Sequence, residues 1–130
     1  MTLEPLLAAP PAIQVHATAA CAAFVLGLAQ LALPKGVTLH RIMGWSWVAI
    51  MVVVAVSSFW IREIKVWGDW SPIHLLSIFA LIMLPLGVAY ARRHVVRGHK
   101  ITMISIFAGA LVIAGIFTFV PGRIMHAIVF

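Results

Sequence analysis

Four long apolar runs divide this chain, and prolines or charged residues separate them from one another. The runs cover residues 12–33, 42–61, 73–91 and 101–120. Each is about 20 residues long, and a helix of that length crosses the roughly 30 Å hydrocarbon layer of a bilayer. The runs do not alternate apolar and polar residues, which disfavours the membrane-spanning β-barrel. The pattern therefore predicts an all-α integral membrane protein with four transmembrane helices.

The connections between the runs are short, so successive helices should be antiparallel neighbours. This predicts an up-down four-helix bundle in which residues 1–130 form a single transmembrane domain. Composition agrees with a membrane environment, because 64% of the 130 residues are apolar and only 9% are charged. A soluble domain would carry about a quarter of charged residues. The chain shows no separate soluble module, so nucleic-acid binding is not expected.

The charges are distributed unequally between the two ends of the bundle. The loops near residues 34–41 and 92–100 share one end, which we call the basic end, and both chain termini share the other, the terminal end. The basic end carries six positive and no negative residues: Lys35, Arg41, Arg92, Arg93, Arg97 and Lys100. The terminal end is balanced by three residues of each sign: Arg62, Lys65, Arg123, Glu4, Glu63 and Asp69. Because Lys and Arg accumulate in cytoplasmic loops, we expect a multi-pass protein of the bacterial inner membrane with both termini, and hence the N-terminus, outside.

The two halves of the chain resemble each other. A proline precedes a histidine at the start of the first and third runs, and the pattern His-basic-Ile begins the second and fourth runs. The residues concerned are Pro11, His16, Pro72, His74, His40–Ile42 and His99–Ile101. Both halves run in the same direction, so the pattern predicts an internal two-hairpin pseudo-repeat with its axis along the membrane normal.

Four of the six histidines are candidates for metal ligands. His16 and His74 begin helices at the terminal end, and His40 and His99 begin helices at the basic end. The first and third helices of an up-down bundle are diagonal across its core, as are the second and fourth, so each pair should face across one level. Two opposed imidazoles suit the axial ligation of haem iron. No CxxCH motif is present, so we expect two b-type haems, one near each membrane face, and transmembrane electron transfer.

Further residues extend this hypothesis. Arg41 and Arg123 are the best-placed cations to neutralise haem propionates by bidentate pairing. His126, three residues after Arg123, could bind a propionate, a quinol or an acidic partner, or it could be a tail at the headgroups. Small residues on the same helix faces, such as Gly27 and Gly44, leave room either for a flat macrocycle or for close helix packing.

Other functions stay open. The protein could be a non-enzymatic accessory subunit that packs through its apolar faces against a larger respiratory or photosynthetic complex. A cluster of His16, His74 and His126 could instead form an open zinc or copper site in a metal or proton carrier. The single cysteine, Cys21, is expected to be a small buried residue, and His94 is expected to be solvated in its basic loop.

Four short motifs carry a resemblance that covers nearly the whole chain: His40-Arg-Ile-Met-Gly44, Ser71-Pro-Ile-His74, Gly98-His-Lys100 and Pro121-Gly-Arg-Ile-Met-His126. The chain resembles a bacterial family of small multi-span membrane proteins known only as a domain of unknown function, which implies no activity. More loosely, it resembles transmembrane di-haem cytochromes b that oxidise ascorbate or quinol. That resemblance implies four haem-ligating histidines in two diagonal pairs and a quinol or redox-protein partner, but here the histidines lie closer to the helix ends.

Overall fold

The computed structural model describes residues 1–61 and 72–130, and every regular element in these two ranges is a helix. The long helices are α2 (Pro11–Ala32), α3 (Thr38–Ser58) and α4 (Pro72–Arg92), followed by a fourth helix in three segments, α5 (Val96–Ile106), η1 (Phe107–Ile113) and α6 (Ala114–Phe117). Two short helices, α1 (Glu4–Leu7) and α7 (Ile124–Val129), lie near the termini. All four long helices are long and apolar enough to cross a membrane, which confirms the all-α prediction and the number of spans.

Some of the predicted features fall on residues 62–71 and so lie outside the described ranges. They are the charges of the second loop and the serine of one motif: Arg62, Glu63, Lys65, Asp69 and Ser71.

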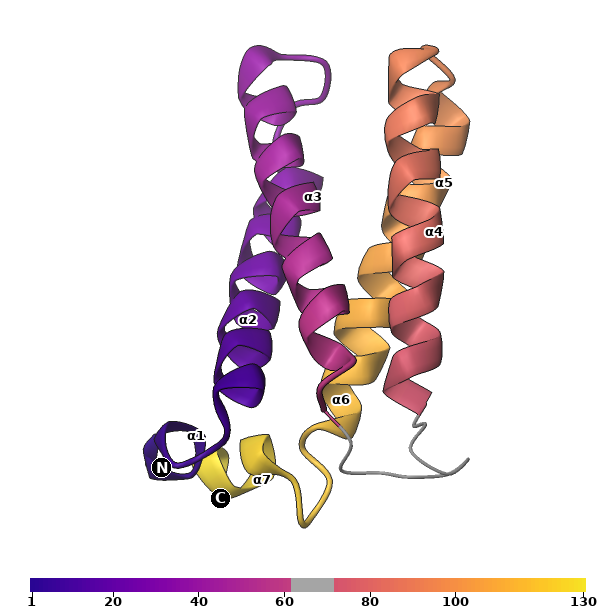
Figure 1. The fold of residues 1–130 in the computed structure, drawn as a ribbon. Helices are drawn as coiled ribbons and strands as arrows, with labels where there is room; N and C mark the ends of the chain where they lie inside the picture. Colours follow the sequence, from indigo (N-terminus) through magenta and orange to yellow (C-terminus); the bar gives the residue numbers. More distant parts are fainter. Residues whose placement is uncertain (62–71) are drawn as a thin grey trace.

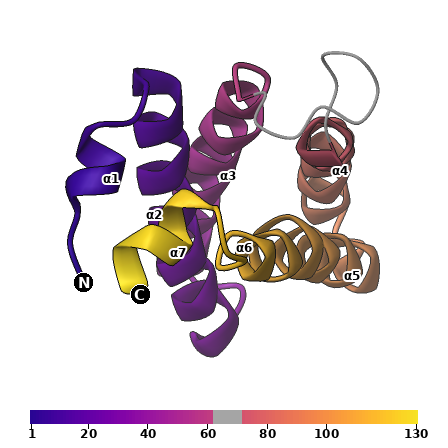
Figure 2. The same cartoon turned by 90° about the horizontal axis from the view of Figure 1, so that it is seen from below.

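The long helices form two hairpins (Figure 1). Helix α2 packs against α3, and α4 packs against α5. The hairpins meet where α3 contacts α4 and where η1 contacts α2. The tips of both hairpins lie at the top of Figure 1, and both termini lie at the bottom. In Figure 2, seen from the terminal end, α3 lies between α2 and α4. Helix α3 therefore contacts a helix of each hairpin.

The second and fourth helices begin earlier than their apolar runs. Helix α3 begins at Thr38 rather than residue 42, and α5 begins at Val96 rather than residue 101. His40 and His99 therefore lie within the first turn of a helix. This agrees with the prediction that both histidines begin helices. The apolar runs start later because the first turn of a helix does not have to be apolar, so a run marks only the part of the helix inside the hydrocarbon layer.

The core lies where the two hairpins meet. Its fully buried side chains include Met51, Leu84 and Ile106. The indole N–H of Trp47 donates a hydrogen bond of 3.0 Å to the carbonyl oxygen of Ala23, which ties α3 to α2. Because this bond is buried, it satisfies the one polar atom that Trp47 brings into the core.

A notch on α2 receives an aromatic ring from the fourth helix. A Cβ atom at Gly27 would stand 2.6 Å from Cε2 of Phe107, so only glycine leaves space for this ring. The same ring stacks on Phe24, with a centroid separation of 5.7 Å. Phe107 is the first residue of the π-helical segment η1. The apolar pattern of the sequence did not predict this segment, because it does not distinguish i→i+5 from i→i+4 hydrogen bonding.

Large apolar side chains cover much of the outer surface. Ile82 and Ile116 are each 64% exposed in the isolated chain. Cys21 is also exposed, so the prediction that it is buried was wrong. The reason is that an apolar residue on a membrane helix can face lipid as well as the core, and sequence alone does not separate the two faces.

The two ends of the chain are joined. The backbone N–H of Thr2 donates a hydrogen bond of 3.1 Å to the carbonyl oxygen of Ile128, and α1 contacts α7. Both termini therefore lie at one end of the bundle (Figure 1).

Candidate functional site

The ring of His16 is held by the neighbouring helix α3. Its Nδ1 atom lies 2.9 Å from the carbonyl oxygen of Val54 and 3.1 Å from the hydroxyl oxygen of Ser57. Because a carbonyl oxygen can only accept a hydrogen bond, Nδ1 carries the proton and donates it. The other ring nitrogen, Nε2, is then unprotonated in the neutral ring and presents its lone pair.

Two further histidines have the same arrangement. Nδ1 of His99 donates to the carbonyl oxygen of Gly87 at 2.8 Å, which ties α5 to α4. Nδ1 of His126 donates to the carbonyl oxygen of Phe119, also at 2.8 Å. A hydrogen bond from one ring nitrogen to a backbone carbonyl is the usual support of a histidine that ligates a metal through its other nitrogen. The donor chemistry of these rings therefore suits a metal or haem iron.

His74 is held differently. Its side chain is only 3% exposed, and its ring stacks nearly parallel on Phe59, with centroids 5.6 Å apart. Phe59 directly follows α3, and one turn beyond His74 the hydroxyl group of Ser77 is hydrogen-bonded to that of Ser58. His16 from α2 and His74 from α4 thus both lie against the last turn of α3, at the terminal end.

His40 is half-buried at the basic end. Its Nδ1 atom is buried and has no hydrogen-bond partner among the described residues, as is true of Oε1 of Gln30. The Gln30 amide donates from Nε2 to the backbone carbonyl oxygen of His40 at 2.7 Å. His99 and Lys35 both lie close enough to His40 to interact with it electrostatically. His40 on α3 and His99 on α5 both lie near the first turn of their helices, at the basic end.

The predicted pseudo-repeat does not extend to the histidine environments. His16 and His74 are equivalent in the sequence pattern, but one is hydrogen-bonded to a carbonyl group and the other is stacked on an aromatic ring. His40 and His99 are also equivalent, and only His99 donates to a backbone carbonyl. The two histidines that share one kind of support, His16 and His99, are thus not at equivalent positions of the two hairpins.

The spaces beside the small residues are filled by protein side chains. The notch at Gly27 holds Phe107, and a Cβ at Gly44 would lie 3.2 Å from Nε2 of Gln30. Of the two interpretations left open by the sequence, these contacts favour close helix packing. In this structure the notch at Gly27 therefore has no room for a macrocycle.

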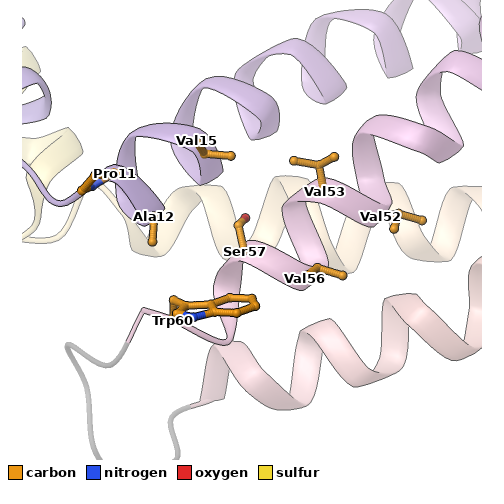
Figure 3. Close-up of a pocket in the computed structure, with 8 residues that line it drawn as sticks. All are labelled: Pro11, Ala12, Val15, Val52, Val53, Val56, Ser57 and Trp60. Atoms are coloured by element: carbon orange, nitrogen blue, oxygen red, sulfur yellow. The ribbon is translucent and has the colours of Figure 1, made fainter.

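Two surface grooves on the described part of the chain have no histidine in their lining. The larger, of about 540 Å³, lies between α2 and α3 and is lined mainly by valines, with Ser57 and Trp60 as its polar members (Figure 3). The smaller, of about 290 Å³, lies between α3 and α4.

The remaining predicted site residues lie at the ends of the bundle. Arg41 is exposed directly after His40, and Arg123 is half-buried as the N-cap residue of α7. The ring of His126 lies 4.9 Å from that of Phe130. Within residues 1–61 and 72–130, no three His, Cys, Asp or Glu side chains gather as a metal site, so His16, His74 and His126 are not brought together.

The sequence analysis missed the part that serines play beside the histidines. Ser57 supports His16, and Ser58 with Ser77 joins α3 to α4 next to His74. A signal was available, because Ser77 follows His74 by three residues and so lies on the same helix face. Polar residues on one face near a span end indicate a contact with a neighbouring helix.

Four apolar helices of spanning length define an integral membrane protein. More narrowly, the chain belongs to the family described as predicted membrane protein (DUF2306), whose family model matches residues 13–129. That description gives no activity. No curated protein and no solved structure matches the chain.

Proposed function

We propose that this protein is a b-type haem protein that transfers electrons across the bacterial inner membrane, with its N-terminus outside. His16 and His74 are the proposed ligands at the terminal end, and His40 and His99 those at the basic end. The observation that carries the proposal is the hydrogen bonding of His16 and His99, whose Nδ1 atoms donate to carbonyl groups of neighbouring helices. When bound, haem would supply a one-electron carrier that the polypeptide lacks.

The surrounding residues hold and orient the rings. Val54 and Ser57 fix the tautomer of His16 and direct its Nε2 away from α3. Gly87 does the same for His99, and Phe59 fixes the ring plane of His74 by stacking. Such fixed rings lose little conformational entropy on binding a ligand.

Charged groups complete the proposed site. Arg41 at the basic end and Arg123 at the terminal end are the proposed partners of the propionates. His126, held by the carbonyl group of Phe119, is the proposed contact for a quinol or a redox protein at the terminal end.

The test is an absorption spectrum of the purified full-length protein, oxidised and then reduced, after expression with a haem supply. We expect a Soret band and a reduced α-band with a stoichiometry of two haems. Replacing His99 or His16 by Ala should remove about half of the absorbance. The matched control is His94→Asn, because His94 is exposed in a loop and its φ of 56° is one that Asn tolerates. Protein that folds, as judged by circular dichroism, but binds no haem would refute the proposal.

A second function is favoured by the outer surface. The groove between α2 and α3 is open and lined almost entirely by apolar groups (Figure 3). Large apolar side chains are also exposed on other helices, such as Ile82 of α4 and Ile116 of α6. Such a surface suits a non-enzymatic subunit that packs against a larger membrane complex. Purification in a mild detergent distinguishes the two functions, because an accessory subunit would co-purify with a large complex and carry no haem of its own.

A further inference from the structure

The groove between α3 and α4 runs toward the basic end. It is lined by Trp45, Val48 and Val52 of α3 and by Leu81, Pro85 and Val88 of α4, and its volume is about 290 Å³. The lining residues of each helix span about two turns, so the groove is about 10 Å long. Its walls are apolar along this length, which suits a segment of a lipid acyl chain.

A cation stands at the end of the groove nearest the hairpin tips. The guanidinium carbon of Arg92 lies 5.9 Å from the ring centroid of Trp45, a cation–π contact that joins α4 to α3. Arg92 follows Val88 by one helical turn, so it lies on the same face of α4 as the groove wall. The contact with Trp45 uses one face of the guanidinium and leaves its edge N–H groups to donate to an anion.

The basic end has no anion of its own. Its loops hold six Lys and Arg residues, and neither loop contains Asp or Glu. Lys35 is already engaged, because its ammonium group donates to three carbonyl oxygens near the end of α2 at 2.7–2.9 Å. The other five cations lie at a span end, which is the depth of the lipid headgroups. Negative charge for them must therefore come from outside the chain.

From this apolar groove and the cations at its end we infer a binding site for an anionic phospholipid, with one acyl chain between α3 and α4 and the phosphate at Arg92. A second copy of the chain fits this face poorly, because it would bring six more cations to the same level if it packed in the same orientation. A neutral lipid would fill the apolar groove but leave the cations without a counter-charge. No histidine lines the groove, so none of the proposed haem ligands enters this argument.

Native mass spectrometry of the full-length protein, with phosphatidylglycerol and phosphatidylcholine in competition, tests whether the site prefers an anionic headgroup. A single basic contact near a membrane surface favours an anionic lipid by about fivefold. We expect Arg92→Gln to lower the preference for phosphatidylglycerol by about that factor. The matched control, Arg97→Gln, removes the same charge from the same end but not from the groove, and should change the preference less than twofold. Equal losses in the two variants would show a diffuse charge effect and overturn the site.

A bulky side chain placed in the groove tests whether an acyl chain binds there. Val88→Trp should remove one tightly bound lipid, whichever headgroup is offered. Its control is Ile82→Trp, which adds the same bulk to α4 at a position that is 64% exposed and does not line the groove. An unchanged number of bound lipids in Val88→Trp, or a loss of dimer rather than of lipid, would overturn the inference. Circular dichroism of both variants establishes that the helices are retained.

Discussion

Replacing Gly27 by Ala tests whether the two hairpins are held together by the Phe107 ring. The new Cβ atom would lie 2.6 Å from Cε2 and 2.7 Å from Cδ2 of Phe107, and 3.0 Å from Nε1 of Trp47. Ordinary van der Waals contact begins near 3.4 Å, so the ring must move by about 0.8 Å. It has little freedom to do so, because Phe107 is only 8% exposed and also stacks on Phe24.

The expected magnitude follows from two opposing effects. Overpacking of this kind costs about 1–3 kcal/mol. Alanine is the better helix former, which offsets about 0.5–1 kcal/mol of that cost. We therefore expect Gly27→Ala to lower the free energy of unfolding by about 1 kcal/mol, within a range of about 0–2.5 kcal/mol. Titration with a denaturing detergent, followed by circular dichroism, measures this loss.

Another glycine of the same chain provides the control. A Cβ atom at Gly115 would have no neighbour within 4 Å, so Gly115→Ala should be neutral or slightly stabilising. Adding Phe107→Leu to Gly27→Ala should recover part of the loss, so that the two changes are not additive. The reasoning is refuted if Gly27→Ala is as stable as Gly115→Ala.

Three other changes address the contacts between helices. Trp47→Phe removes the hydrogen bond to Ala23 and should lower the free energy of unfolding by about 1–2 kcal/mol, measured by the same titration; no change would mean that the bond is not retained in the detergent. Lys35→Met removes the ammonium group that donates to the carbonyl oxygens at the end of α2. Amide hydrogen exchange in that last turn should then accelerate several-fold, and unaltered exchange would mean that Lys35 does not cap the helix. Ser58→Ala and Ser77→Ala should each cost about 0.6 kcal/mol, and the double variant should cost no more than either one, whereas additive losses would show that the two hydroxyl groups do not act together.

The sequence predicted the helices well because their signal is local. Four apolar runs of spanning length are enough to predict four helices, since backbone groups in a bilayer must be satisfied within each segment. The polar first turns from Thr38 and Val96 lie outside the apolar runs, and only the His-basic-Ile pattern indicated that helices begin there. Cys21 was placed wrongly because the lipid-facing and core-facing sides of a membrane helix have the same composition.

The candidate site could be predicted only in part. The pattern identified which histidines begin helices and at which end they lie. It could not show that His16 donates to the carbonyl group of Val54 or that His74 stacks on Phe59, because these partners lie on other helices. The space at Gly27 was also ambiguous in the sequence, since a flat cofactor and an aromatic side chain both require a residue without a Cβ atom.

The hydrogen bond between Thr2 and Ile128 has a consequence for the order of the helices. Because residues 2 and 128 are in direct contact, a short peptide linker between the two ends would close the chain into a ring at little entropic cost. New ends could then be opened in the exposed turn around Gly36, at the opposite end of the bundle. In such a permuted protein every helix would keep its neighbours while the new ends emerged on the other side of the bilayer. Reporters fused to the ends of the permuted protein and, separately, to the ends of the unpermuted chain would therefore mark opposite faces of the membrane.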